Sequence, residues 1–215
     1  MRVTKFIFSL FFLIISTLVF SQDIYLNRKT QDVKDIQILE QKAAARTMNF
    51  RANPNTENYD LKYHRLEWTV DPAVEFVDGI VTSYFVAKSD MNTITFDLTD
   101  NMNVTQVLQR GVALSFVNGS DDELIITLPT TLLQNTLDSL TVHYNGVPQN
   151  SGFDSFQVST HAGIPILGTL SEPYGAKDWW PCKQDLIDKI DSIDVYVTHD
   201  SQYKAASNGL LISEI

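Results

Sequence analysis

The sequence predicts an all-β protein, a large twisted β-sandwich preceded by a signal peptide and a short N-terminal helix. Two observations carry the β prediction. Short runs rich in β-branched and aromatic residues recur from residue 59 onward, and Gly, Asn and Pro residues separate them. Many short strands with this punctuation are typical of two packed sheets or one large twisted sheet.

The predicted strands follow in chain order, and the first of them carries an irregularity. Tyr59, Leu61 and Tyr63 alternate, and the apolar phase then shifts to Leu66 and Trp68, which predicts a β-bulge. The runs are "YDLKYHRLEWTV" (59–70), "GIVTSYFVA" (79–87), "TITFDL" (93–98), "LIITL" (124–128), "LTVHYNG" (140–146), "SIDVYVTH" (192–199) and "YKAASNG" (203–209).

The first 21 residues have the layout of a secretory signal peptide. Arg2 and Lys5 precede an apolar run from Phe6 to Phe20, and Ser21 offers a small residue at the expected cut. The run is shorter than the roughly 20 residues that span a bilayer as a helix, although an uncleaved anchor is the alternative. We therefore expect an exported protein, periplasmic or extracellular, with no stable membrane span after cleavage.

Residues 22–58 are predicted to form a helix and a polar linker. Val33, Ile36 and Leu39 recur at near-helical spacing, and Pro54 interrupts the polar stretch that follows. Residues 59–215 then form the β domain. The chain stops directly after a predicted strand, so we expect this domain to be incomplete at its C-terminal end.

Charge and cysteine content exclude several classes of function. The net charge of −10 falls to −12 once Arg2 and Lys5 leave with the signal peptide. A chain this acidic repels phosphate backbones, which argues against nucleic-acid binding. Cys182 is the single cysteine, so no internal disulfide can form, and we expect its side chain to be a small buried hydrophobe.

The residues that hold catalytic metals are dispersed. The histidines are His64, His143, His161 and His199, and no HExxH motif is present. We therefore expect neither a metal site nor a catalytic residue in this chain, and we interpret the histidines as surface or core-edge groups. The carboxylates from Asp185 to Asp194 are interpreted as solvated faces or turn caps.

One segment, "LGTLSEPYGAKDWWPC" (167–182), cannot be a regular strand because it combines Gly, Pro, two adjacent Trp and the lone Cys. Pro173 holds the backbone of Glu172 extended. A carboxylate on a rigid turn beside aromatic rings suits recognition of an ammonium group. The alternative is an ordinary inter-strand loop packed by Trp179 and Trp180.

"EPYGAKDWWPC" (172–182) resembles the "EP-x-x-AR-x-x-FPC" signature of aminopeptidase N-type (gluzincin) zinc metallopeptidases. The strands upstream, "LTVHYNGVP" and the downstream "SIDVYVTHDSQYKAASNG" are also similar to that family, so the resemblance covers residues 59–211. Lys177 stands where the family has arginine and Trp180 where it has phenylalanine. These departures resemble a bacterial exported branch.

The resemblance implies a saddle-shaped N-terminal domain that packs against a thermolysin-like catalytic domain lying beyond this chain. Zinc would be held by that domain in the parent enzyme, not by this chain alone. The resemblance also implies that Glu172 holds the α-amino group of peptides with a free N-terminus. Pro173, Tyr174 and Gly175 are further candidates for substrate contact.

Two functions remain open at this point. The chain is either the N-terminal domain of an exported zinc aminopeptidase, inactive without its catalytic partner, or a non-catalytic exported β-sandwich that binds or interacts with other molecules. The missing HExxH motif keeps the second alternative open.

Overall fold

The computed structural model describes residues 33–34, 36–41, 44–45, 47–48, 50–149, 155–172 and 174–215. The chain divides into two compact units, 1–45 and 46–215. The described residues from 33 to 48 are helical, which agrees with the helix predicted within residues 22–58. The predicted signal peptide lies outside the described residues. Within those residues, no helix combines the length and apolar character needed to cross a membrane.

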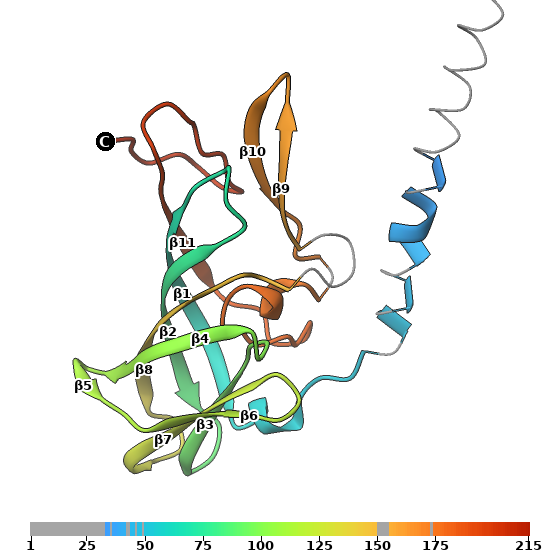
Figure 1. The fold of residues 1–215 in the computed structure, drawn as a ribbon. Coiled ribbons are helices and arrows are strands. Elements are labelled where there is room, and N and C mark those ends of the chain that lie inside the picture. Colours follow the sequence, from blue (N-terminus) through green and yellow to red (C-terminus); the bar gives the residue numbers. More distant parts are fainter. Residues whose placement is uncertain are drawn as a thin grey trace, which may run out of the picture. The chain divides into compact units, whose positions relative to one another are not determined.

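The second unit contains eleven strands in three sheets (Figure 1). The largest sheet has the order β11-β1-β2-β8-β4-β5, a second has the order β3-β7-β6, and β9 and β10 form a hairpin. Every pair is antiparallel except β1 with β11. The bounds are β1 Tyr59–Val70, β2 Val77–Ala87, β3 Met91–Asp97, β4 Met102–Gln109, β5 Val112–Ala113, β6 Phe116–Gly119, β7 Glu123–Leu132, β8 Leu137–Gly146, β9 Phe156–His161, β10 Ile164–Thr169 and β11 Ser192–Thr198, with 3₁₀ turns η1 Pro54–Thr56 and η2 Ala176–Asp178.

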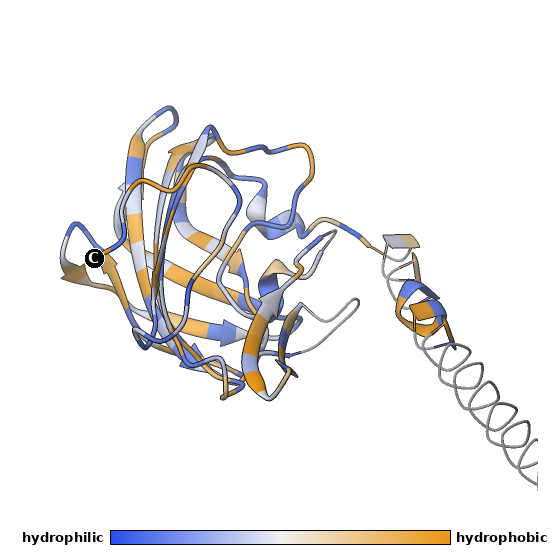
Figure 2. Ribbon diagram, turned by 90° about the horizontal axis from the view of Figure 1, so that it is seen from above, coloured by the Kyte–Doolittle hydropathy of each residue, from blue (hydrophilic) through white to orange (hydrophobic). Residues whose placement is uncertain are grey.

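The six-stranded and three-stranded sheets share one hydrophobic core, which confirms the predicted sandwich. Alternate residues of β2 and β8 point inward, and hydropathy alternates along the strands in Figure 2. Phe85 and Val142 come from the larger sheet, whereas Phe96 and Ile126 come from the smaller one, and all four are almost fully buried. Burial of each such side chain contributes roughly 1.5–3 kcal/mol.

The bulge predicted in the first strand is present. The pairing of β1 with β2 slips by one residue between Leu61 and Tyr63, so Lys62 is the extra residue. The side-chain alternation therefore changes phase earlier than the sequence pattern indicates. His64 enters the core, and Tyr63 lies half-buried on the outer face beside Tyr84, with the two ring centroids 5.6 Å apart.

One predicted strand is wrong. Residues 203–209 are irregular, and a turn precedes them in which the Tyr203 N–H donates to the Asp200 carbonyl over 3.0 Å. The described residues 204–215 pair with no other strand, so their extended backbone has no ladder to join. Conversely, β4, β9 and β10 form although the sequence pattern did not place them. The β9–β10 hairpin leads directly into the segment that carries Glu172 (Figure 1).

Candidate functional site

Glu172 lies on a tight turn between β10 and η2, and its side chain is exposed. The Gly175 N–H donates to the Ser171 carbonyl over 2.6 Å, which closes the turn around Glu172. Pro173 lies outside the described residues. The turn therefore presents one carboxylate to solvent while its two ends are held by the backbone.

Tyr174 and Gly175 pack the C-terminal end of this turn against neighbouring segments of the chain. The Tyr174 ring is stacked on Phe50, with centroids 3.6 Å apart and planes 5° from parallel. A Cβ atom at Gly175 would lie 2.4 Å from Ser155 Oγ and 3.1 Å from Ser171 Cα. Glycine is therefore required here by a close approach of two chain segments. Of the three predicted contact residues that the structure describes, Tyr174 and Gly175 are buried and Glu172 is exposed.

The two adjacent tryptophans contact different partners. The Trp179 indole N–H donates to Ser171 Oγ over 2.9 Å, and its ring packs 4.4 Å from the ring of Trp68. The Trp180 ring instead meets His64 edge to face, with centroids 5.2 Å apart. Trp179 thus fixes the residue that precedes Glu172, while Trp180 packs against His64 of β1.

Buried polar contacts fix η2 itself. The Asp178 carboxylate is fully buried and accepts a hydrogen bond from Ser155 Oγ over 2.6 Å. The Lys177 ammonium contacts Asp122 over 2.6 Å, and the Lys177 carbonyl accepts from the Thr99 N–H over 3.0 Å. Lys177 therefore makes a point contact, consistent with a lysine where the resembling family has a bidentate arginine.

The chain after η2 pairs with β3. Asp97 and Cys182 exchange two backbone hydrogen bonds of 2.8 and 3.0 Å, and Cys182 is buried as predicted. The Asp97 carboxylate accepts from the Asn53 side chain over 3.1 Å and from the Gln184 N–H over 2.8 Å. Burial raises the pKa of Asp97, and these two hydrogen bonds act against that rise.

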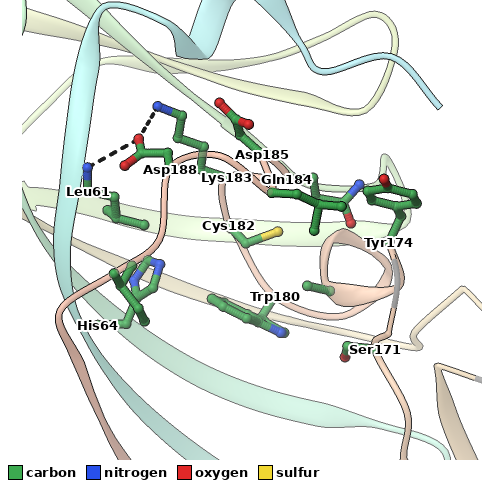
Figure 3. A pocket seen from close by; sticks show the side chains of 13 residues that line it. Leu61, His64, Ser171, Tyr174, Trp180, Cys182, Lys183, Gln184, Asp185 and Asp188 are labelled. Atoms are coloured by element: carbon green, nitrogen blue, oxygen red, sulfur yellow. Dashed lines mark hydrogen bonds and ion pairs between the residues drawn. The ribbon is translucent and has the colours of Figure 1, made fainter.

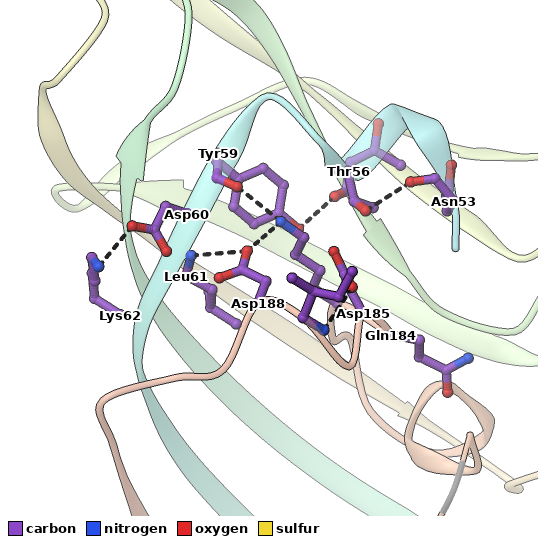
Figure 4. Close-up of polar contacts among 12 residues, drawn as sticks. Asn53, Thr56, Tyr59, Asp60, Leu61, Lys62, Gln184, Asp185 and Asp188 are labelled. Carbon is purple, nitrogen blue, oxygen red and sulfur yellow. Dashed lines mark hydrogen bonds and ion pairs between the residues drawn. The ribbon is translucent and has the colours of Figure 1, made fainter. Parts of the chain in front are cut away.

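A buried ion pair holds the loop of residues 183–188 against β1 (Figure 4). The Lys183 ammonium contacts the Asp188 carboxylate and donates to the Tyr59 carbonyl over 2.8 Å. Only 1% of the Lys183 side chain and 9% of the Asp188 side chain are exposed. The interpretation of the carboxylates after Asp185 as solvated is therefore wrong for Asp188. Its partner Lys183 lies five residues earlier in the chain, but nothing in the sequence indicates that the pair is buried.

A hollow of about 240 Å³ lies beside this loop (Figure 3). Leu61 and His64 of β1 line it together with Trp180, Cys182, Leu186 and Ile190 from the chain after η2. Ser171 and Tyr174, which flank the Glu172 turn, also reach it. The hollow and the exposed carboxylate are therefore neighbours along the same segment.

His64 is fully buried, so its interpretation as a surface or core-edge histidine is wrong. Its Nδ1 lies 3.0 Å from Ser83 Oγ on β2, the residue directly opposite in the ladder. Burial lowers the pKa of His64 to about 4, which keeps the ring neutral at physiological pH. The described residues include no group of three or more His, Cys, Asp or Glu side chains that could hold a metal ion.

Solved structures of zinc metallopeptidases are similar to this chain. An M1 zinc metallopeptidase from Deinococcus radiodurans matches with 26% identity and a TM-score of 0.63 over 73% of this chain. A mutant of that enzyme bound to a Tyr-Ser-Ala substrate, and a two-domain M1 zinc metallopeptidase mutant bound to L-arginine, match with the same values. No protein-family model matches the chain, and no curated protein matches it.

The match covers 36% of the length of each of these metallopeptidases. The resemblance that the sequence indicates is confirmed at the level of the fold and of this family, and it is consistent with an N-terminal domain. The chain therefore resembles about a third of an M1 zinc metallopeptidase.

Proposed function

We propose that this chain is the N-terminal β domain of an exported zinc aminopeptidase, and that Glu172 holds the α-amino group of the peptide substrate. The observation that carries the proposal is the match to M1 zinc metallopeptidases over 73% of the chain. Two of these similar proteins are described with a peptide substrate or L-arginine bound. L-arginine carries the α-amino group that Glu172 would recognise.

The local geometry of the turn supports this role for Glu172. Its carboxylate is exposed, whereas the residues around it are fixed by the Gly175–Ser171 and Trp179–Ser171 hydrogen bonds. An ionised carboxylate accepts hydrogen bonds from a substrate ammonium, and such charge-assisted bonds are worth about 1.5–3 kcal/mol. A preformed turn loses little conformational entropy when the ammonium binds.

Zinc enters the proposal through the parent enzyme alone. The described residues do not fit a metal site, so no step of hydrolysis is assigned to them. Zinc ligands and the catalytic base would come from a thermolysin-like domain outside these residues. That domain would supply a metal-activated water as the nucleophile.

The complete reading frame that contains these residues tests the proposal. We expect an HExxH motif within roughly 150 residues after Ile215. The four-residue separation of its two histidines places both imidazoles on one face of a helix. The purified product should contain stoichiometric zinc and cleave aminoacyl amides, but not their N-acetylated forms. A frame without that motif, or a product that cleaves blocked substrates equally well, would favour the non-catalytic binding module.

A further inference from the structure

The hollow beside the Lys183–Asp188 pair combines apolar walls with aromatic ones (Figure 3). Leu61, Leu186 and Ile190 supply aliphatic surface, and Trp180 meets His64 edge to face. Its volume of about 240 Å³ exceeds the roughly 150 Å³ of an engineered cavity that binds benzene. The hollow therefore has room for one six-membered ring with a small substituent.

One polar atom reaches the hollow without a partner. His64 Nδ1 is engaged by Ser83, and no described residue hydrogen-bonds to Nε2. Among the described residues, Asn58 Oδ1 is the single side-chain N or O atom that is both shielded from solvent and without a hydrogen-bond partner. Because His64 Nε2 also has no partner but does not share that condition, it is accessible to solvent. Since the His64 residue is 98% buried and lines the hollow, its residual exposure is toward the hollow.

Two of the three charged side chains that line the hollow compensate one another. The Lys183 ammonium and the Asp188 carboxylate form their own ion pair, and Lys183 also donates to the Tyr59 carbonyl. The His64 ring is neutral. The third charged side chain of the lining is that of Asp185, which is half-buried and accepts a hydrogen bond from the Ile187 N–H over 2.9 Å. Its carboxylate would repel an anionic ligand, and the aliphatic and aromatic walls favour an uncharged one.

We propose that this hollow binds an uncharged aromatic ring that carries one hydroxyl group, a phenol, with the hydroxyl bonded to His64 Nε2 and the ring against Trp180. A hydroxyl both donates and accepts, so it matches either tautomer of the imidazole. Ring contacts with Trp180 add to the free energy of apolar burial. A free phenol and the side chain of a tyrosine share this chemistry. The site is independent of the role proposed for Glu172.

Titration of the ¹⁵N-labelled 215-residue chain with p-cresol tests this site. The indole N–H signal of Trp180 should shift saturably, whereas that of Trp68, which is bonded to Tyr144 over 3.0 Å, should not. Toluene lacks the hydroxyl and should bind about two- to tenfold more weakly. N-acetyl-tyrosinamide distinguishes a free phenol from a tyrosine side chain as the natural ligand. It should shift the Trp180 signal only if the hollow is open enough to admit a tyrosine within a peptide.

Four variants make the test specific, two at residues that line the hollow and two at residues outside it. Leu186→Trp should fill the hollow and abolish the shift, whereas Ile187→Trp, at a side chain that points away and is 93% exposed, should leave it unchanged. His64→Leu should remove the preference for p-cresol over toluene, and Glu172→Ala should bind p-cresol like the parent chain. A shift that does not saturate, equal binding of toluene, or undiminished binding by Leu186→Trp would overturn the proposal.

Discussion

The indole N–H of Trp179 donates to the hydroxyl of Ser171 over 2.9 Å, which ties the residue before Glu172 to the residue that follows η2. Trp179 is itself fixed in the core, since it is 4% exposed and packs against Trp68 and Phe156. Through this bond the core of the sandwich determines where the Glu172 carboxylate projects.

Removing either partner of this bond should destabilise the domain. Ser171→Ala leaves the Trp179 N–H buried without an acceptor, and we expect a loss of about 1–3 kcal/mol in the free energy of unfolding. Trp179→Phe should cost at least as much, because it also leaves a cavity. Urea denaturation of both single variants and the double variant measures the coupling. Additive losses would contradict a specific bond.

Glu172 should matter for binding and little for stability. In the proposed parent enzyme, Glu172→Ala should lower kcat/KM by roughly ten- to a hundredfold, since each 1.36 kcal/mol is a factor of ten. Glu172→Gln should retain part of the activity, because the amide oxygen still accepts a hydrogen bond. Since the side chain is exposed, the melting temperature should hardly change. A lower melting temperature with unchanged kcat/KM would make the residue architectural.

Protonation of His64 should destabilise the domain in acid. Its pKa is about 4 in the folded state, against about 6.5 for an unfolded histidine. Between these values the unfolded state binds a proton that the folded state does not. The free energy of unfolding should therefore fall as the pH drops from about 6.5 to about 4, by roughly 3 kcal/mol in total.

Urea unfolding of His64→Asn at several pH values tests this assignment. His143→Asn is the matched control, because His143 is a half-buried histidine on β8. The first variant should be less stable than the parent chain near pH 7 and should lose much of the pH dependence in this window, whereas the second should keep it. Asp97, whose raised pKa favours the folded state in acid, acts in the opposite sense in all three proteins. Equal slopes in all three would refute the assignment to His64.

Breaking the Lys183–Asp188 pair should be costly. Lys183→Met leaves the Asp188 carboxylate buried without its cation, and we expect a loss of about 3–5 kcal/mol. Lys62→Met is the matched control, because the Lys62–Asp60 pair is 36% and 38% exposed and should cost less than about 1 kcal/mol. Thermal or urea unfolding compares the two. Similar small losses would mean that the buried pair is dispensable.

Gly79 should not tolerate a side chain. It lies opposite Tyr144 in the β2–β8 ladder, and a Cβ atom there would approach the Tyr144 ring to 2.4 Å. Gly79→Ala should displace the ring, weaken its bond to Trp68 and cost about 1–3 kcal/mol. Gly168→Ala, on β10 with open space around it, should be nearly neutral. Circular dichroism melts of both variants decide between these outcomes.

The sequence by itself determined the all-β class, most of the strands, the bulge in the first strand and the turn that carries Glu172. Those features depend on neighbouring residues: alternation with period two, β-branched runs, and Gly, Pro and Asn at turns. The strand expected at 203–209 failed because a strand also needs a partner edge, which local pattern does not specify.

The tertiary structure alone decided the chemistry beneath the turn. Lys183 can be buried because the carbonyl of Tyr59, 124 residues away in the chain, accepts a hydrogen bond from its ammonium group. His64 is buried because the slip at Lys62 turns it inward opposite Ser83. In both cases the free energy of a polar side chain depends on partners brought close only by folding, so composition and spacing could not predict which histidine, lysine and aspartate would leave the solvent.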